Sequence, residues 1–244
     1  MSKVDRLNPL IEILRSSPDR VWKVWVDRGS RNQRINEIIS LARAGHIPVH
    51  FVPRVTLDRM SRRHQGIVAD VSSRGFVPLE SLLEASPRSF LVLLDEVEDP
   101  QNLGAVIRTA ESAGADGIIL PERRSAGLTE TVAAVSAGAL EHIPVARVKN
   151  LVRTMEELKK RGIWLVGAEA DAKEKWHDFD YTLPVGLVMG SEGKGLRPLV
   201  RKTCDKVLSL PLRGRVSSLN VSSAAAVFLY EVVRQREQKQ DSVE

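Results

Sequence analysis

The chain has 244 residues, 43% of them hydrophobic and 27% charged, so it is long and apolar enough to bury a substantial core. No apolar run approaches the ~20 residues that a membrane-spanning helix needs, and the first residues lack the apolar stretch of a secretory signal, which argues against a membrane or secreted protein. The single cysteine, Cys204, has no partner for an internal disulfide, which favours a cytoplasmic location.

Positive charge is concentrated in the first third of the chain. Residues 1–73 contain 13 Lys and Arg against 7 Asp and Glu, a net charge of +6, whereas residues 74–244 contain 23 against 24, a net charge of −1. A basic segment of this kind is typical of a surface that neutralises the phosphates of a nucleic acid. A solvated basic surface explains the charge equally well, so the charge alone leaves both interpretations open.

The first third is predicted to fold as a small α/β unit over residues 1–73. Apolar and alternating runs predict strands at 21–26, 47–52 and 66–71. Apolar residues at helical spacing from Ile35 to Ala42, followed by Gly45, predict a helix, and 57–62 fits a second, shorter one. Turn-forming residues then indicate a linker over 74–88 with a short helix at 78–85.

The remaining residues, 89–244, alternate short apolar runs with helical patterns. The runs predict strands at 90–94, 117–120, 163–167, 185–189 and 207–210. Helical spacing of apolar residues predicts helices over 151–158 and 224–233, beyond which the polar residues 234–244 are expected to fray. Strands without an alternating polar face suit a parallel sheet covered on both sides, so we expect a doubly wound α/β domain.

Polar residues directly follow three of these strands. They occupy 95–104, 190–195 and 211–220. In an open parallel sheet, ligands bind beyond the carboxyl ends of the strands. Each cluster alone fits a helix cap or a turn, but three clusters at equivalent ends of neighbouring strands predict one shared site.

Common nucleotide and metal motifs are absent from the sequence. In the segment 190–195, GSEGKG, the glycine spacing differs from a dinucleotide fingerprint, and Gly195 stands where a P-loop needs Ser or Thr. The five histidines show no metal-ligand spacing and there is no CxxC or HExxH, so no metal is expected. His64 is singled out because it lies in the basic third, directly before Gln65 and Gly66.

The three polar clusters resemble the motifs of the SpoU/TrmH branch of the SPOUT methyltransferases. The matching segments are 102–110 (NLGAVIRTA), 187–196 (LVMGSEGKGL), and Leu210-Pro211 with 217–224 (SSLNVSSA). They occur in the order of that family within residues 90–236. The resemblance implies an enzyme that moves a methyl group from S-adenosylmethionine to a ribose 2′-hydroxyl of RNA.

The chain is also similar to the RlmB-type subgroup of that family, which methylates a guanosine of large-subunit (23S) ribosomal RNA. Asn8-Pro9-Leu10 and 64–69 carry this similarity in the first third, and 124–126 and Asn150-Leu151 carry it further on. Arg6-Leu7 departs from the subgroup, which has a glycine before the asparagine.

The resemblance implies a fold and an assembly as well. Residues 89–244 would form a SPOUT domain with a mostly parallel sheet and a deep trefoil knot, and residues 1–73 a small L30e-like domain that binds the RNA substrate. The enzyme would be a homodimer with its active site near the subunit interface. Knots are very rare in proteins, so only the resemblance supports this one.

Roles are implied for the residues at matching motif positions. Arg108 would act at the 2′-hydroxyl, and because a guanidinium stays protonated in proteins, we expect it to orient the adjacent phosphate and stabilise the developing alkoxide instead of acting as the base. Asn102 would hold Arg108 or the ribose. The other implied catalytic residues are Glu192, Ser218 and Asn220. Backbone contacts to the cofactor are implied at Gly190, Leu210 and Leu219.

The sequence has three alternative interpretations. The same chemistry could act on transfer RNA instead of ribosomal RNA. A relative that binds RNA without catalysis is disfavoured because Asn102, Arg108, Glu192, Ser218 and Asn220 are all present. A generic nucleotide-binding α/β enzyme is disfavoured because the phosphate-binding motifs are missing.

Overall fold

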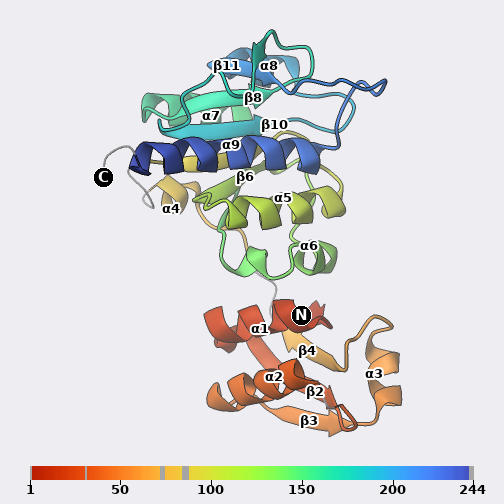
Figure 1. The fold of residues 1–244 in the computed structure, drawn as a ribbon. Coiled ribbons are helices and arrows are strands. Elements are labelled where there is room, and N and C mark those ends of the chain that lie inside the picture. Colours follow the sequence, from red (N-terminus) through yellow and green to blue (C-terminus); the bar gives the residue numbers. More distant parts are fainter. Residues whose placement is uncertain (1, 31, 72–74, 84–87, 242–244) are drawn as a thin grey trace. The chain divides into compact units, whose positions relative to one another are not determined.

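The computed structural model describes residues 2–30, 32–71, 75–83 and 88–241 (Figure 1). The chain divides into two compact units, one of Met1–Gly75 with Leu128–His142 and one of Phe76–Gly127 with Ile143–Glu244. The sequence did not predict that Leu128–His142 belongs with the first unit. Arg74 and residues 84–87 of the expected linker lie outside the described residues.

The first unit is built on a four-stranded mixed sheet in the order β1-β4-β2-β3, in which only β2 and β3 pair in parallel. Its elements are β1 (Ser2–Val4), α1 (Leu7–Ser16), the 3₁₀ turn η1 (Pro18–Arg20), β2 (Val21–Asp27), α2 (Gln33–Ala44), β3 (Val49–Val52), α3 (Arg54–Met60), β4 (Ile67–Val71), α6 (Glu130–Val135) and the 3₁₀ turn η2 (Ala139–Glu141). The predicted strands and the helix around 35–42 are confirmed, and the short helix expected at 57–62 lies at Arg54–Met60, whereas β1, α1 and α6 were not predicted.

Helices α1 and α2 supply most of the core of the first unit. Leu10 of α1 and Ile38 of α2 are fully buried in one cluster with Val24 of β2. The later segment Leu128–His142 is attached by polar contacts, because Arg20 pairs with the buried carboxylate of Glu141. Residues that are distant in sequence therefore complete this unit.

The second unit is built on a seven-stranded sheet in the order β7-β6-β5-β10-β8-β11-β9, and all its registered strand pairs are parallel. Its elements are α4 (Leu79–Leu83), β5 (Phe90–Leu94), α5 (Pro100–Ser112), β6 (Gly117–Pro121), β7 (Val145–Val148), α7 (Leu151–Lys160), β8 (Trp164–Ala168), β9 (Glu174–Lys175), β10 (Val185–Met189), α8 (Pro198–Thr203), β11 (Lys206–Ser209) and α9 (Val221–Asp241).

Helices cover both faces of this sheet (Figure 1). On one face, α4, α7 and α8 share a buried cluster with strand residues such as Leu93 and Val188. On the other, α5 and α9 pack against each other, with α5 touching β6 and α9 touching β10. All residues of β5, β6 and β10 are buried, which explains why these strands read as uninterrupted apolar runs. The α/β class and the parallel sheet are confirmed.

Two sequence-based expectations about this unit are corrected. Strand β8 separates β10 from β11, so the three polar clusters do not all follow adjacent strands. The last helix does not fray at residue 234 but continues to Asp241. Its polar side chains are held: Gln235 bonds the backbone at Phe179 and Tyr181, and Arg236 donates to the Tyr181 and Leu183 carbonyls. Within the described residues, no helix is long and apolar enough to cross a membrane.

Candidate active site

The first polar cluster connects β5 to α5. Asp99 caps α5, its carboxylate accepting the Gln101 N–H at 3.0 Å, and Pro100 occupies the first turn, where its missing N–H costs nothing. Asp99 therefore has the capping role that the sequence left open. Asn102, one turn further, is instead buried, and its side chain is directed away from α5 toward the loop after β10.

That loop, 190–195, folds back on itself. Ser191 and Gly195 exchange two backbone hydrogen bonds, of 3.1 and 3.0 Å, so Glu192 lies in a tight turn. Gly193 and Gly195 have φ of +80° and +66°, which favours glycine at both. A Cβ on Gly190 would lie 2.2 Å from the Gly195 carbonyl carbon, so the two strands of the turn approach too closely for any side chain there.

Two carboxylates from the strands on either side of β10 hold the end of this loop. Asp95, fully buried directly after β5, accepts the Arg197 backbone N–H at 2.9 Å and the Arg197 guanidinium at 2.7 and 2.8 Å. Glu169, directly after β8, accepts the Leu196 N–H. The hydrogen bond that the Arg197 guanidinium donates to Asp95 raises the pKa of that guanidinium. The backbone N–H groups of the consecutive residues Leu196 and Arg197 are thus held by carboxylates that follow β8 and β5, the strands on either side of β10.

The third polar cluster leads from β11 into α9. Asn220 satisfies the start of that helix, since its Oδ1 accepts the Ser222 backbone N–H at 2.9 Å and the Ser222 hydroxyl at 2.6 Å. Its Nδ2 remains available and donates to Asn102 Oδ1 at 2.8 Å. Asn220 therefore both caps α9 and connects that helix to Asn102 of α5.

One chain of hydrogen bonds joins the three clusters. Asn220 donates to Asn102, and Asn102 Nδ2 donates in turn to Glu192 Oε2 at 3.2 Å. The partners are separated by 118 and 90 residues in sequence. Because the Asn102 oxygen is occupied by a donor, its amide group can present only N–H to Glu192, so the orientation of Glu192 depends on both asparagines.

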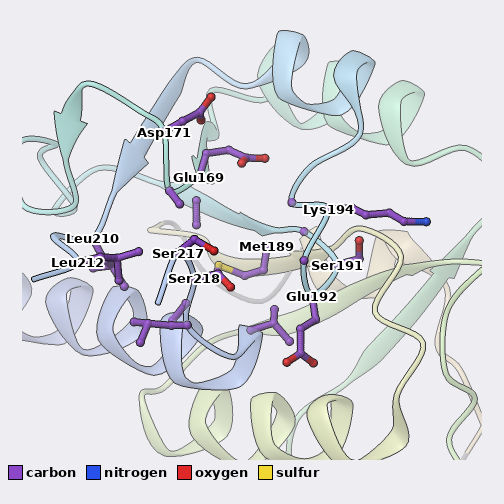
Figure 2. A pocket seen from close by; sticks show the side chains of 18 of the residues that line it. Glu169, Asp171, Met189, Ser191, Glu192, Lys194, Leu210, Leu212, Ser217 and Ser218 are labelled. Atoms are coloured by element: carbon purple, nitrogen blue, oxygen red, sulfur yellow. The ribbon is translucent and has the colours of Figure 1, made fainter. Parts of the chain in front are cut away.

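A cavity of about 320 Å³ adjoins this chain of hydrogen bonds at Glu192, which is one of its lining residues, and Figure 2 shows the side chains that line it. Five of the residues implied by the motifs line it, namely Gly190, Glu192, Leu210, Ser218 and Leu219. Its wall contains apolar side chains such as Met189 and Leu212 together with the polar side chains of Ser191 and Ser217. A mixed wall of this kind, in a cavity within the common range of about 300–1,000 Å³, suits a small ligand with an apolar ring and polar ends.

Arg108 is not brought into the cavity. It lies on α5, six residues after Asn102, and at 3.6 residues per turn the two side chains leave the helix roughly 120° apart. Arg108 is exposed, and its guanidinium makes no hydrogen bond or ion pair with the residues that the structure describes. Asn102 therefore holds Glu192 and not Arg108. Asn102 and Asn220 likewise stand behind the cavity wall instead of lining it.

The sequence analysis missed the contribution of β8 to this cavity. Glu169, Ala170 and Asp171 line it, and they follow a predicted strand directly. Polar residues follow an apolar run here, as they do in the other three clusters. This segment lacks a glycine-rich turn, and the signal was therefore overlooked. Among the described residues, no group of three His, Cys, Asp or Glu is arranged to hold a metal ion.

A cavity beyond the carboxyl ends of the central strands of a parallel sheet, with a polar chain at its edge, defines an α/β enzyme domain. Comparison with known proteins makes this specific. Residues 89–230 match the model of the SpoU rRNA methylase family, and residues 7–75 match the model of an RNA 2′-O ribose methyltransferase substrate-binding domain. The chain belongs to the SpoU family of RNA methylases, as the three motifs predicted.

Individual relatives resemble the chain over nearly its whole length. YacO of Bacillus subtilis, assigned to the TrmH family of tRNA/rRNA methyltransferases, is 46% identical over 234 residues, or 94% of both chains. The 23S rRNA (guanosine-2′-O-)-methyltransferase RlmB of Pseudomonas aeruginosa is 44% identical over 96% of both. The structure of the SpoU methyltransferase AviRb from Streptomyces viridochromogenes with its cofactor AdoMet aligns with a TM-score of 0.82 and 28% identity, covering 97% of this chain and 90% of AviRb.

Proposed function

We propose that the protein transfers a methyl group from S-adenosylmethionine to the ribose 2′-hydroxyl of a guanosine in 23S ribosomal RNA. The observation that carries this proposal is the chain Asn220–Asn102–Glu192 at the edge of the cavity, because it joins all three motifs into one site. The relatives support the reaction, since RlmB is named for this methylation and AviRb binds AdoMet.

The donor would occupy the cavity, and its wall fits that molecule. Gly190, Leu210 and Leu219 line the cavity and would contact the donor through their backbones, as the motifs imply, and without a Cβ Gly190 lets the backbone approach closely. When bound, S-adenosylmethionine supplies a methyl group activated by the positive sulfonium. The reaction forms a bond from the methyl carbon to the 2′-oxygen and breaks the bond from that carbon to sulfur.

The residues of the chain then have to orient the hydroxyl and remove its proton. Glu192 lines the cavity and its carboxylate is held by Asn102; we assign that carboxylate as the acceptor for the proton, which requires its side chain to turn toward the bound ribose (Figure 2). Ser218 lines the same cavity and would hydrogen-bond the ribose, with Asn220 keeping the two loops together. Most of the rate enhancement would come from this positioning and from charge stabilisation.

Arg108 would act on the RNA phosphate and the developing alkoxide from outside the cavity of a single chain. This fits a homodimer whose active site lies near the subunit interface. Two apolar side chains of α9 favour such an interface, because Val227 and Tyr230 are 40% and 52% exposed.

The remaining parts of the proposal concern the fold and its setting. We propose that the C-terminal segment forms a deep trefoil knot. The position of strand β10 supports this, because β10 lies between β5 and β8 in the sheet although it follows both in the chain. The first unit would be an L30e-like domain that binds RNA. A cytoplasmic location is included because the substrate is ribosomal RNA.

The test is methyl transfer in vitro. Purified protein and donor with a radiolabelled methyl group are incubated with unmodified 23S rRNA transcript and, separately, with transfer RNA transcripts. Label in 23S rRNA, mapped to one guanosine as a 2′-O-methyl, supports the proposal. Label in transfer RNA alone would make transfer RNA the substrate in place of 23S rRNA. The absence of label from both transcripts and from RNA of cells that lack the gene contradicts the methyltransferase activity.

A further inference from the structure

One segment of the first unit presents four arginines to solvent. Arg54 and Arg59 belong to α3, and Arg62 and Arg63 to the turn that follows it; all four are exposed. None of them has an ion pair or a side-chain hydrogen bond with any residue that the structure describes. Within ten residues of sequence, four exposed arginines without an acidic partner in the described part of the chain concentrate positive charge on one surface, which we call the arginine segment.

The turn that carries Arg62 and Arg63 is fixed by buried side chains. His64 is only 2% exposed, and its Nδ1 accepts the Gly66 N–H at 3.0 Å. The ring therefore carries its hydrogen on Nε2, which donates to Asp58 at 2.9 Å. His64 thus closes the turn onto α3.

A second set of bonds ties the same turn to the start of the chain. Gln65 accepts the Leu7 backbone N–H at 3.0 Å and donates its own N–H to the Asp5 carbonyl at 3.2 Å. Ser61 donates its hydroxyl to Asp5 and accepts the Arg63 N–H at 3.2 Å. The motif around His64 and Gln65, which the catalytic site does not use, therefore builds a rigid frame beneath two outward arginines.

The acidic groups nearby are already engaged. Asp58 accepts from His64, Asp5 accepts from Ser61, and Asp27 accepts the Gly29 N–H at 3.1 Å. Arg28 adds a further positive charge at this end of the sheet, because its backbone N–H bonds the Val52 carbonyl just before α3. The balance of charge at this end remains positive.

We propose that the arginine segment binds the sugar–phosphate backbone of the RNA substrate, with His64 and Gln65 holding it in its binding conformation. This inference rests on the proposed function for the identity of the RNA. Guanidinium groups pair with phosphates in bidentate geometry, and a turn that is ordered before binding loses little conformational entropy on binding. The contact would supply affinity and orientation without reading the base sequence.

The test compares two double variants that remove equal charge from opposite ends of the first unit. R62Q/R63Q changes the arginine segment. R15Q/R43Q changes Arg15 in the last turn of α1 and Arg43 in the last turn of α2. These helices precede the starts of β2 and β3, whereas the arginine segment follows the end of β3. Binding of unmodified 23S rRNA transcript is measured over a range of salt concentrations, and donor binding is measured by calorimetry.

We expect R62Q/R63Q to make the slope of log K against log salt shallower by about one unit per arginine, roughly two in total, while R15Q/R43Q leaves the slope unchanged. Donor binding should stay unchanged in both. Equal slopes for wild type and R62Q/R63Q overturn the inference. A slope that R15Q/R43Q reduces by the same amount as R62Q/R63Q overturns it as well.

The outcomes separate this inference from the proposed function. If the wild type methylates RNA but the slope is insensitive to Arg62 and Arg63, this surface is wrong and the activity stands. If the slope falls as expected but no RNA is methylated, the surface stands and the proposed activity is wrong. If R62Q/R63Q fails only on assembling ribosomal particles and not on naked RNA, the partner is a protein and the inference is overturned.

Discussion

Replacing Asn102 by aspartate changes one atom of the chain that joins the three motifs. The side chain keeps the oxygen that accepts from Asn220, but the nitrogen that donates to Glu192 becomes a second carboxylate oxygen. A hydrogen bond of 3.2 Å is thereby converted into a contact between two acceptors of like charge. The variant tests whether the orientation of Glu192 matters for catalysis, with almost no change in volume.

The size of the effect follows from the geometry. Loss of a hydrogen bond to a charged group costs about 1.5 kcal/mol, and two carboxylates about 4 Å apart repel by ~1 kcal/mol in water and ~4 kcal/mol at an effective dielectric constant of 20. Because Glu192 is exposed, the repulsion lies near the lower value. A total of roughly 2–3 kcal/mol corresponds to a fall in kcat of about 30- to 160-fold.

The assay is single-turnover methyl transfer at saturating donor and RNA, with donor affinity and Tm measured in parallel. Asn150→Asp is the matched control, since Asn150 caps α7 by accepting the Arg153 N–H and aspartate caps as well as asparagine does. Lowering the pH should restore part of the variant's activity, because one proton shared by the two carboxylates replaces the amide hydrogen. A kcat within threefold of wild type, or a loss confined to donor binding, would refute the assigned role.

Four further outcomes are expected. Arg108→Lys should lower the rate while leaving the shape of the pH–rate profile unchanged, and loss of a titration step would mean that Arg108 acts as the base. Asp95→Asn should lower the free energy of unfolding by about 2 kcal/mol in urea titrations, since the buried carboxylate bonds both the backbone and the side chain of Arg197; an unchanged value would remove its anchoring role. Burial raises the pKa of the Cys204 thiol to about 12, so Ellman's reagent should react slowly at pH 8 and quickly in urea, and fast native reaction contradicts that burial. Val227→Asp should dissociate the proposed dimer into monomers in analytical ultracentrifugation; a dimer that persists places the interface elsewhere, and a monomeric wild type contradicts the dimer itself.

The strands were predictable wherever burial erased the alternation of polar and apolar residues. Strands β5 and β10 are buried throughout and were located to the residue, whereas β7, with the exposed Arg147, was not predicted. Helix α1 was also missed, although Leu10, Ile11 and Leu14 form an apolar face, because its start had been interpreted only as a motif. The sequence pattern thus identifies a strand when all of its residues are equally buried.

The structure brings Asn102, Glu192 and Asn220 of the three motifs together, but the contacts among them were not predictable from the sequence. Asn102 was expected to hold Arg108 or the ribose, whereas its side chain bonds Glu192 and Asn220. Residues six apart on one helix point in different directions, so helical geometry alone argued against the pair of Asn102 and Arg108. The actual partners depend on the order of strands in the sheet, which fixes contacts across 90 and 118 residues and leaves no periodic signal in the sequence.

The strand order also explains how an exposed glutamate can be held accurately. Glu192 lies in a glycine-rich turn that has no core of its own, and flexible glycines would let such a turn move. Asp95 and Glu169 remove that freedom from two sides, because β10 lies between the strands that carry them. Asn102 then fixes the remaining rotation of the side chain from α5. Precision at this site therefore comes from three neighbouring elements, and a change in any of their polar groups should reduce turnover before it unfolds the domain.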